Sequence, residues 1–183
     1  MGRFGRLLMI TALLALTLPM CAQEPSSADS ASQMRVPPPA QNADPVELEQ
    51  QGDQLRAQKA YLDAIDYYRT ALKSSESAVL HNKIGMCHLQ MRRDAEAKKE
   101  FQRAIKENKD YAEAYNNLGA LYYNSRRYGA AIREYKKAIK INEGSASFHS
   151  NLGGAYFSQK DFDRAAKEYQ RAIEIDPDIF QRQ

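Results

Sequence analysis

Only one group of soft metal ligands, that is imidazole and thiol side chains, lies close together in this sequence. His81, Cys87 and His88 offer two imidazoles and a thiol, which are ligand types that zinc prefers. His81 and His88 are seven residues apart, near one face of a helix, so a metal ion could bind between them. A closed tetrahedral site needs a fourth ligand, which this spacing does not provide. We therefore expect no metal, and we interpret Cys87 as a small apolar core residue.

The sequence contains no catalytic motif. The nucleophile elbow Gly-x-Ser-x-Gly, the zinc-protease motif His-Glu-x-x-His and the phosphate-binding glycine loop are all absent from its 183 residues. We therefore expect a protein that is not an enzyme and needs no cofactor.

Asparagines recur in segments whose apolar residues follow a helical pattern. Asparagine is unfavourable in helix interiors, because its amide competes for backbone hydrogen bonds, so a reason for its presence is needed. A row of amides could hydrogen-bond the backbone of an extended peptide without reading its side chains. The residues concerned are Asn82, Asn116, Asn117, Asn124 and Asn151.

A cluster of basic residues could bind an anionic partner. However, Glu96, Glu100 and Glu107 are interleaved with it. This interleaving is typical of a solvated outer face, which is the interpretation that we prefer. The basic residues are Lys98, Lys99, Arg103 and Lys106.

An internal repeat defines the elements that must position these residues. Four glycines recur at spacings of 33, 34 and 34 residues: Gly52, Gly85, Gly119 and Gly153. At fixed distances after each glycine the chain has an alanine, an aromatic residue, a second alanine and a large aliphatic residue. In the third unit these are Ala131, Tyr135, Ala138 and Ile139. A period of this length predicts a solenoid of stacked units.

Each unit contains two segments with helical periodicity, separated by a short polar turn. In the third unit the apolar residues recur every three or four positions over 115–122 and again over 128–139. This pattern predicts a hairpin of two amphipathic helices. The small residues Gly119 and Ala131 would let these helices cross closely. One hairpin cannot bury both of its faces, so neighbouring hairpins must stack.

These residues resemble the tetratricopeptide repeat, whose pattern combines a Leu-Gly pair, a Tyr, an Ala, an aromatic residue and a closing Pro. The third unit has Glu143 in place of the proline, and the first has Gln51 in place of the leucine. The second unit has His81 and His88 where large apolar or aromatic residues are usual. The fourth unit matches through Leu152, Gly153, Tyr156, Ala165, Tyr169 and Pro177.

The resemblance implies an all-α fold, a right-handed solenoid of four helix-turn-helix tetratricopeptide-like repeats over residues 45–178. The expected units are 45–77, 78–111, 112–145 and 146–179, followed by a short C-terminal tail at 180–183.

In this family the first helix of each hairpin lines a concave groove, so the resemblance implies a groove that binds a peptide or protein segment. The first unit offers acidic Glu49 and Asp53 on that face, which argues against the Lys and Arg clamp that binds a C-terminal carboxylate in some relatives. An equally good explanation of the asparagines is that this residue type is simply common at these positions in the family, without a role in binding. The expected groove residues are Asn82, Lys83, Asn116, Asn117, Tyr123, Asn124, Asn151 and Phe157.

Residues 1–22 have the pattern of a secretory signal peptide. They begin with two arginines, continue with an apolar run over 7–18 and include the small residue Ala22 near the expected cleavage site. The run is shorter than the ~20 residues that span a membrane, so an uncleaved anchor is the less favoured alternative. Acylation of Cys21, as in bacterial lipoproteins, ranks below plain secretion, because the large residue Met20 precedes it.

The chain after residue 22 begins with a Pro-, Ser- and Ala-rich segment at 23–44. It has too few apolar residues to fold, so we expect a disordered tether. The whole chain has 26 basic and 23 acidic residues, and losing Arg3 and Arg6 with the signal would leave 24 against 23. This balance gives no argument for nucleic-acid binding.

We therefore expect a secreted or periplasmic, non-catalytic module that binds a protein or peptide. The alternatives are a structural subunit that assembles through the ends of the solenoid, and an envelope protein bound to polysaccharide. The last helix should end near Ile175 and leave Tyr169 and Ile173 partly covered, which predicts a homo-oligomer or a docked partner helix at the C-terminal end. A membrane would be involved only if the N-terminal segment is retained or Cys21 is acylated.

Overall fold

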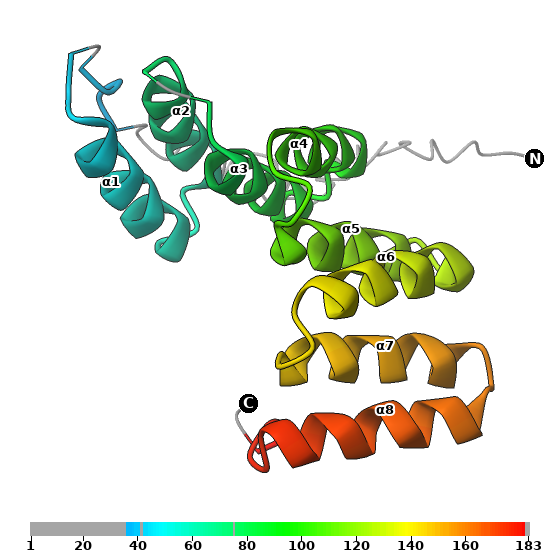
Figure 1. Ribbon diagram of the computed structural model, residues 1–183. Coiled ribbons are helices and arrows are strands. Elements are labelled where there is room, and N and C mark those ends of the chain that lie inside the picture. The colour runs from blue at the N-terminus through cyan, green and yellow to red at the C-terminus, as the bar shows by residue number, and fades with distance from the viewer. Residues whose placement is uncertain (1–35, 41, 75, 182–183) are drawn as a thin grey trace, which may run out of the picture. The chain divides into compact units, whose positions relative to one another are not determined.

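The computed structural model describes residues 36–40, 42–74 and 76–181, and every regular element in them is an α-helix (Figure 1). The expected signal peptide and most of the expected tether lie outside the described residues. The predicted all-α fold is confirmed. The described helices are α1 (Pro45–Ala57), α2 (Tyr61–Leu72), α3 (Ala78–Gln90), α4 (Asp94–Glu107), α5 (Ala112–Asn124), α6 (Tyr128–Ile141), α7 (Ala146–Ser158) and α8 (Phe162–Ile175).

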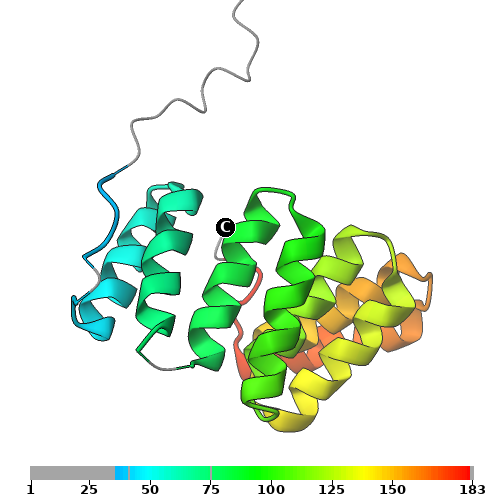
Figure 2. The ribbon, with the colours of Figure 1, turned by 90° about the horizontal axis from the view of Figure 1, so that it is seen from above.

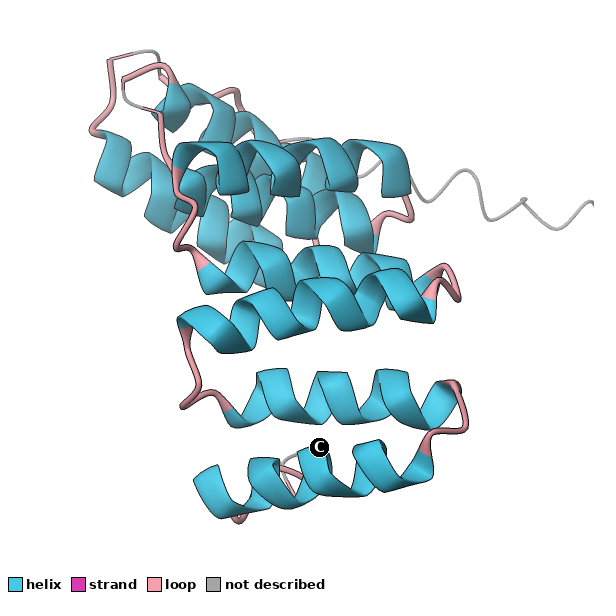
Figure 3. Cartoon of the chain, turned by 45° about the vertical axis from the view of Figure 1, so that its right-hand side comes forward, coloured by secondary structure: helices cyan, strands magenta, loops and turns pink. Residues whose placement is uncertain are grey.

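The helices pack as four hairpins, in agreement with the four predicted repeats. The pairs are α1 with α2, α3 with α4, α5 with α6 and α7 with α8, and each second helix also contacts the first helix of the next hairpin. Figure 2 shows the hairpins following one another, and Figure 3 shows the loops that connect the helices. The first helices α3, α5 and α7 also contact each other in sequence, α3 with α5 and α5 with α7. We call these three helices the inner row.

Each hairpin crosses at a glycine that lies against an aromatic ring of the second helix. A Cβ atom placed on Gly119 would lie 2.6 Å from Cε1 of Tyr135, which is closer than packed carbon atoms approach. In the first hairpin the corresponding distance, from Gly52 to Cε1 of Tyr68, is 2.5 Å. The recurring glycine of the sequence is therefore required by close packing of a ring, as its spacing indicated.

Each hairpin turns at a basic residue with a left-handed backbone, a feature that the sequence reasoning did not identify. In the third hairpin the N–H of Arg127, which follows this residue, donates to the carbonyl of Tyr122 at 2.8 Å. The left-handed conformation costs free energy for any residue with a Cβ atom, but a cation is favourable beside a helix C-terminus. The four residues, with φ values of 63°, 58°, 56° and 63°, are Lys59, Arg92, Arg126 and Lys160.

The C-terminal hairpin ends as predicted, with α8 terminating at Ile175. The following residues turn back, so that the ring of Phe180 lies edge-on to the ring of Tyr169, with centroids 5.7 Å apart. Phe162 and Ile173 on α8 stay 57% and 40% exposed. No helix of the described part is long and apolar enough to cross a membrane.

Candidate functional site

The eight residues predicted for the groove all lie on the inner row. Asn82 is buried, Asn124 and Phe157 are exposed, and the other five are half-buried. From the N-terminal to the C-terminal side, α3 carries Asn82 and Lys83, α5 carries Asn116, Asn117, Tyr123 and Asn124, and α7 carries Asn151 and Phe157.

Amide side chains link the helices of the inner row to one another. Nδ2 of Asn117 donates a hydrogen bond of 2.9 Å to Oδ1 of Asn82, and Nδ2 of Asn151 donates one of 2.9 Å to Oδ1 of Asn116. Both bonds join residues 35 positions apart, so the same contact recurs at successive junctions between hairpins. The asparagines therefore have a structural role that the sequence reasoning did not foresee, because a period of 34 says nothing about which amide faces which.

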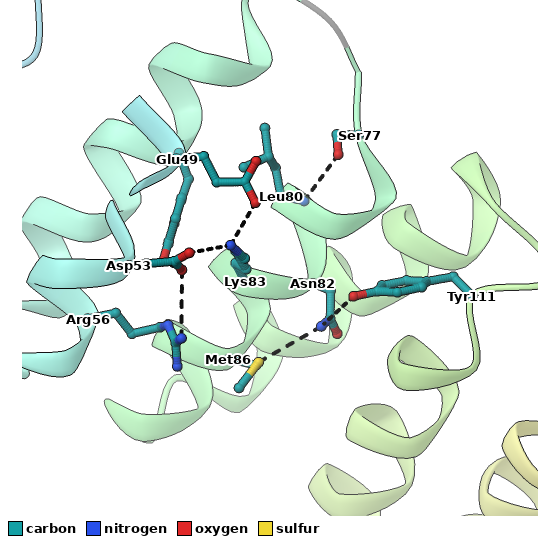
Figure 4. A network of polar contacts seen from close by, with 10 residues as sticks. Glu49, Asp53, Arg56, Ser77, Leu80, Asn82, Lys83, Met86 and Tyr111 are labelled. Atoms are coloured by element: carbon teal, nitrogen blue, oxygen red, sulfur yellow. Dashed lines mark hydrogen bonds and ion pairs between the residues drawn. The ribbon is translucent and has the colours of Figure 1, made fainter. Parts of the chain in front are cut away.

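At the N-terminal end of the row, Lys83 is held by two carboxylates (Figure 4). Its Nζ lies 2.6 Å from Oε1 of Glu49 and 2.6 Å from Oδ2 of Asp53, both on α1. Only 18% of the Lys83 side chain is exposed. The positive charge of Lys83 is thus compensated inside the protein, and the carboxylates that argued against a carboxylate clamp are the groups that compensate it.

Asp53 also accepts a hydrogen bond of 2.8 Å from the hydroxyl of Tyr68. Burial alone would raise the pKa of Asp53, but the hydrogen bonds from Lys83 and Tyr68 and the charges of Lys83 and Arg56 outweigh it and hold this pKa below its ordinary value. Burial and the bond to Asp53 together raise the pKa of Tyr68. The first junction between hairpins is therefore a closed network in which Asp53 stays ionised and Tyr68 stays neutral.

At the C-terminal end of the row there is a cavity of about 480 Å³. Its lining comes from α5, α6, α7, α8 and the C-terminal turn, and none of the lining side chains carries a charge at neutral pH. Tyr123 also accepts a hydrogen bond of 3.1 Å from Ser158. The lining residues are Tyr123, Tyr135, Ser150, Asn151, Gly154, Tyr169 and Phe180.

Of the two histidines that suggested a metal site, His81 is paired with carboxylates, whereas Nδ1 of His88 is buried without a hydrogen-bond partner in the described part. His81 lies between Glu76 and Glu100, with 2.8 Å from a ring nitrogen to each carboxylate. No group of three potential ligands that could hold a metal ion occurs among the residues that the structure describes. His88 is 5% exposed, and burial lowers its pKa.

The pairing of His81 corrects the interpretation of the basic cluster as a wholly solvated face. Glu100 is 6% exposed, because it is buried between His81 and Arg103, whose Nη1 lies 2.7 Å from the Glu100 carboxylate. The spacing of charges along α4 did not reveal this, since the partner His81 lies on another helix.

Comparisons with known proteins agree with this geometry. The family described as tetratricopeptide repeat matches residues 82–146 and 121–178, which together span more than half of the chain. A crystal structure of MamA is 27% identical, covers 73% of this chain and 78% of its own, and superimposes with a TM-score of 0.65. No curated protein sequence matches the chain.

Two further solved structures share the fold. MamA 41-end from Desulfovibrio magneticus RS-1 is 21% identical, with a TM-score of 0.64 over 75% of this chain and 78% of that one. YrrB, described as a TPR protein with an unusual peptide-binding site, is 23% identical, with a TM-score of 0.60 over 70% of this chain and 66% of that one. The repeated glycine contacts, the four hairpins and the family match agree, and the chain belongs to the tetratricopeptide repeat family.

Proposed function

We propose that this protein is a non-catalytic interaction module that binds a peptide or protein segment along its inner row, α3, α5 and α7. Tetratricopeptide repeats are protein-interaction modules, so membership of the family supports the general role. YrrB, which shares the fold, is described as having a peptide-binding site, so a solenoid of this kind can hold a peptide.

The observation that carries the proposal is the unused hydrogen-bonding capacity of the asparagines. Asn117 and Asn151 are half-buried, and each uses Nδ2 in a bond to the preceding hairpin. Within the described residues, their Oδ1 atoms and Nδ2 of Asn116 have no partner. One side of each amide is therefore fixed by the protein, while the other can accept from or donate to the backbone of an extended segment. Amides held in this way have little freedom left to lose when a ligand binds.

The test uses peptides selected from a random-sequence display library on the full chain. Binding of the selected peptides, measured by calorimetry, should weaken about two- to tenfold for each hydrogen bond lost in Asn117→Ala with Asn151→Ala. Gln102→Ala is the matched control, since Gln102 is an exposed amide residue on α4, outside the inner row. Unchanged affinity in the double variant, or equal loss in the control, would contradict the proposal.

The proposal includes export to the cell envelope or medium. It rests on the basic and apolar pattern of residues 1–22 and on the Pro-rich segment that follows. If the signal is cleaved, mass spectrometry of the protein from its native cell should find an N-terminus at or near Gln23. Detection of intact Met1 on folded protein in the cytosol would exclude export.

A second candidate function, assembly through the solenoid end, is favoured by a contrast between the two ends. In α7, the residues Phe148, Leu152 and Ala155 are buried, and they belong to core clusters that also contain residues of α6. The corresponding residues of α1, which has no preceding hairpin in the described part, are polar and exposed: Glu47, Gln51 and Gln54.

At the other end, the outer face of α8 remains apolar, with Phe162 and Ile173 exposed. A polar α1 face cannot cover it well, so a self-associated form would join two α8 faces and not head to tail. Light scattering should then show dimers that dissociate in Ile173→Asp. A monomer at all concentrations, with no bound partner, would contradict this second candidate.

A further inference from the structure

The cavity at the C-terminal end of the inner row is lined by tyrosine hydroxyls that have no partner in the described part of the protein. Tyr135 is 2% exposed and lines the cavity, yet its hydroxyl makes no hydrogen bond within the described residues. Tyr169 and Ser150 line the same cavity, and their hydroxyls also have no partner there. None of these hydroxyl oxygens is among the fully buried side-chain atoms without a partner, so they are accessible from the cavity and can bond to a group that enters it.

Comparison with the first repeat shows which hydrogen-bond partner these tyrosine hydroxyls lack. Tyr68 and Tyr169 occupy the same position in the first and fourth repeats, as their corresponding contacts with Gly52 and Gly153 show. The hydroxyl of Tyr68 donates to Asp53, the residue after Gly52. After Gly153 the chain has Gly154, and a Cβ atom placed there would lie 3.6 Å from the hydroxyl of Tyr169.

The third repeat lacks the carboxylate as well. Its tyrosine at this position is Tyr135, and Ala120 follows Gly119 where Asp53 follows Gly52 in the first repeat. The cavity therefore exists because two successive repeats lack the side chain that satisfies the tyrosine hydroxyl in the first. A ligand group that enters the cavity can supply the missing partner.

The lining restricts the chemistry of that group. No cation lines the cavity, whereas Asp53 has Lys83 beside it, so an ionised carboxylate would be poorly compensated there. Burial raises the pKa of both Tyr135 and Tyr169, so both hydroxyls remain neutral donors and acceptors. An uncharged hydrogen-bonding group therefore fits better than a charged one.

The rings favour an aromatic side chain over a sugar. The ring of Tyr135 packs on Gly119, and that of Tyr169 contacts Gly153 and makes a T-shaped pair with Phe180. The ring of Tyr123 contacts Tyr128, with centroids 5.4 Å apart. The ring pairs already present in and beside the cavity are tilted or T-shaped and not stacked, and a further aromatic side chain can join such a cluster in the same edge-to-face geometry. Stacking of a sugar on an aromatic face would need a flat platform, which a cluster of tilted rings does not favour.

We propose that this cavity receives an aromatic side chain with a neutral hydrogen-bonding tip, tyrosine or tryptophan, from a segment bound along the inner row. The proposal rests on the proposed function and names the side chain that anchors the segment. A cavity of about 480 Å³ lies within the range of sites that enclose small ligands.

Nuclear magnetic resonance titration of the full chain with amino-acid amides tests the proposal. N-acetyl-tyrosinamide and N-acetyl-tryptophanamide should shift the amide signals of Asn151 and Gly154, and should bind about two- to tenfold more tightly than N-acetyl-phenylalaninamide, which lacks the polar tip. N-acetyl-lysinamide should not shift these signals. Equal binding of all four probes, no binding of any, or tighter binding of N-acetylglucosamine would overturn the proposal.

Two variants separate the cavity from the fold. Gly154→Asn adds a neutral side chain where Asp53 stands in the first repeat, and its Cβ has room. It should abolish binding of both aromatic probes while helicity by circular dichroism is unchanged. Tyr135→Phe keeps the ring and should remove the preference for the tyrosine probe over the phenylalanine probe. If both variants fold and bind the probes like the parent chain, the cavity is not the anchor.

The selected peptides distinguish this proposal from the proposed function. Tyrosine or tryptophan should recur at one position among them, and Gly154→Asn should weaken their binding at least tenfold. If peptide binding is weakened by the Asn117 and Asn151 substitutions but not by Gly154→Asn, the groove function is supported and the aromatic anchor is excluded.

Discussion

The two ends of the inner row use the same repeat in opposite ways. At the first junction, Tyr68, Asp53 and Lys83 satisfy each other, and Glu49 adds a second carboxylate at 2.6 Å from the lysine. At the last junction, the corresponding tyrosine faces a glycine, and a cavity takes the place of the ion pairs. Both ends have the same hairpins and the same glycine–ring contact, so the fold itself does not cause the difference.

The contrast shows how one residue per repeat determines whether the space beside the tyrosine is filled. A side chain after the recurring glycine of the repeat fills the space beside the tyrosine and accepts its hydrogen bond, as Asp53 does. Glycine at the same place leaves the space and the hydrogen-bonding capacity available. The closed end has its polar groups paired within the protein, whereas the open end keeps a cavity, and each prediction below changes one end and compares it with the other.

The largest effect is expected where a ring meets the crossing glycine. Gly52→Ala should destabilise the protein by about 2–3 kcal/mol, because its Cβ would lie 2.5 Å from the fully buried ring of Tyr68, which cannot move aside. Gly153→Ala should cost only about 1 kcal/mol, since the half-buried Tyr169 can shift toward the cavity. Urea denaturation measures both, and equal losses would show that the open end is as rigid as the closed one.

A smaller difference is expected when the hydroxyl alone is removed. Tyr68→Phe deletes the bond to the Asp53 carboxylate and should cost about 1.5–3 kcal/mol, the usual range for hydrogen bonds to charged groups. Tyr135→Phe removes a hydroxyl without a partner in the described residues and should leave stability unchanged or slightly raised. Thermal unfolding of both variants checks this pair. A substantial loss in Tyr135→Phe would mean that the hydroxyl has a structural role.

The fold could be predicted from sequence because its determinants are local and repeated. The glycine spacing and the aromatic residue 16 positions after each glycine record a contact within one hairpin, and four copies of it fixed the number of hairpins. The left-handed turn residues were missed, because Lys59 and Arg126 are not the glycine or asparagine that normally marks such a backbone.

The site was harder to predict, because its determinants lie between hairpins. The sequence placed Lys83 and the asparagines on the correct helices, but the bonds from Lys83 to Glu49 and from Asn117 to Asn82 depend on how neighbouring hairpins stack. The cavity was missed entirely as a site. Comparing Asp53 with Gly154 at the same place in the repeat was the signal that could have found it.

A smaller loss of stability is expected from breaking the ion pairs at the first junction. Lys83→Met keeps the apolar stem and removes the charge, leaving two carboxylates close together, and should cost about 1 kcal/mol at low salt. The loss should shrink in about 1 M salt, where charges are screened. Asn151→Ala is the comparison at the other end, and its effect should not depend on salt. If Lys83→Met also abolished binding of the aromatic probes, the two ends would not be independent of each other.

The smallest expected effect is the response of the closed end to acid. The pKa of Asp53 is held below its ordinary value of 3.8, so the folded protein binds fewer protons here than the unfolded chain does. The stability that this carboxylate contributes is therefore complete above about pH 5 and is lost as the pH falls below 4 through the lowered pKa. Urea denaturation from pH 6 to pH 2.5 should show the difference between the parent chain and Asp53→Asn constant at first and then shrinking. The open end has no acidic group in its lining, so the difference between the parent chain and Tyr135→Phe should not change over this range. If the Asp53→Asn difference were also constant down to pH 2.5, the carboxylate would not be held ionised by Lys83 and Tyr68, and the contrast between the two ends would lose its electrostatic basis.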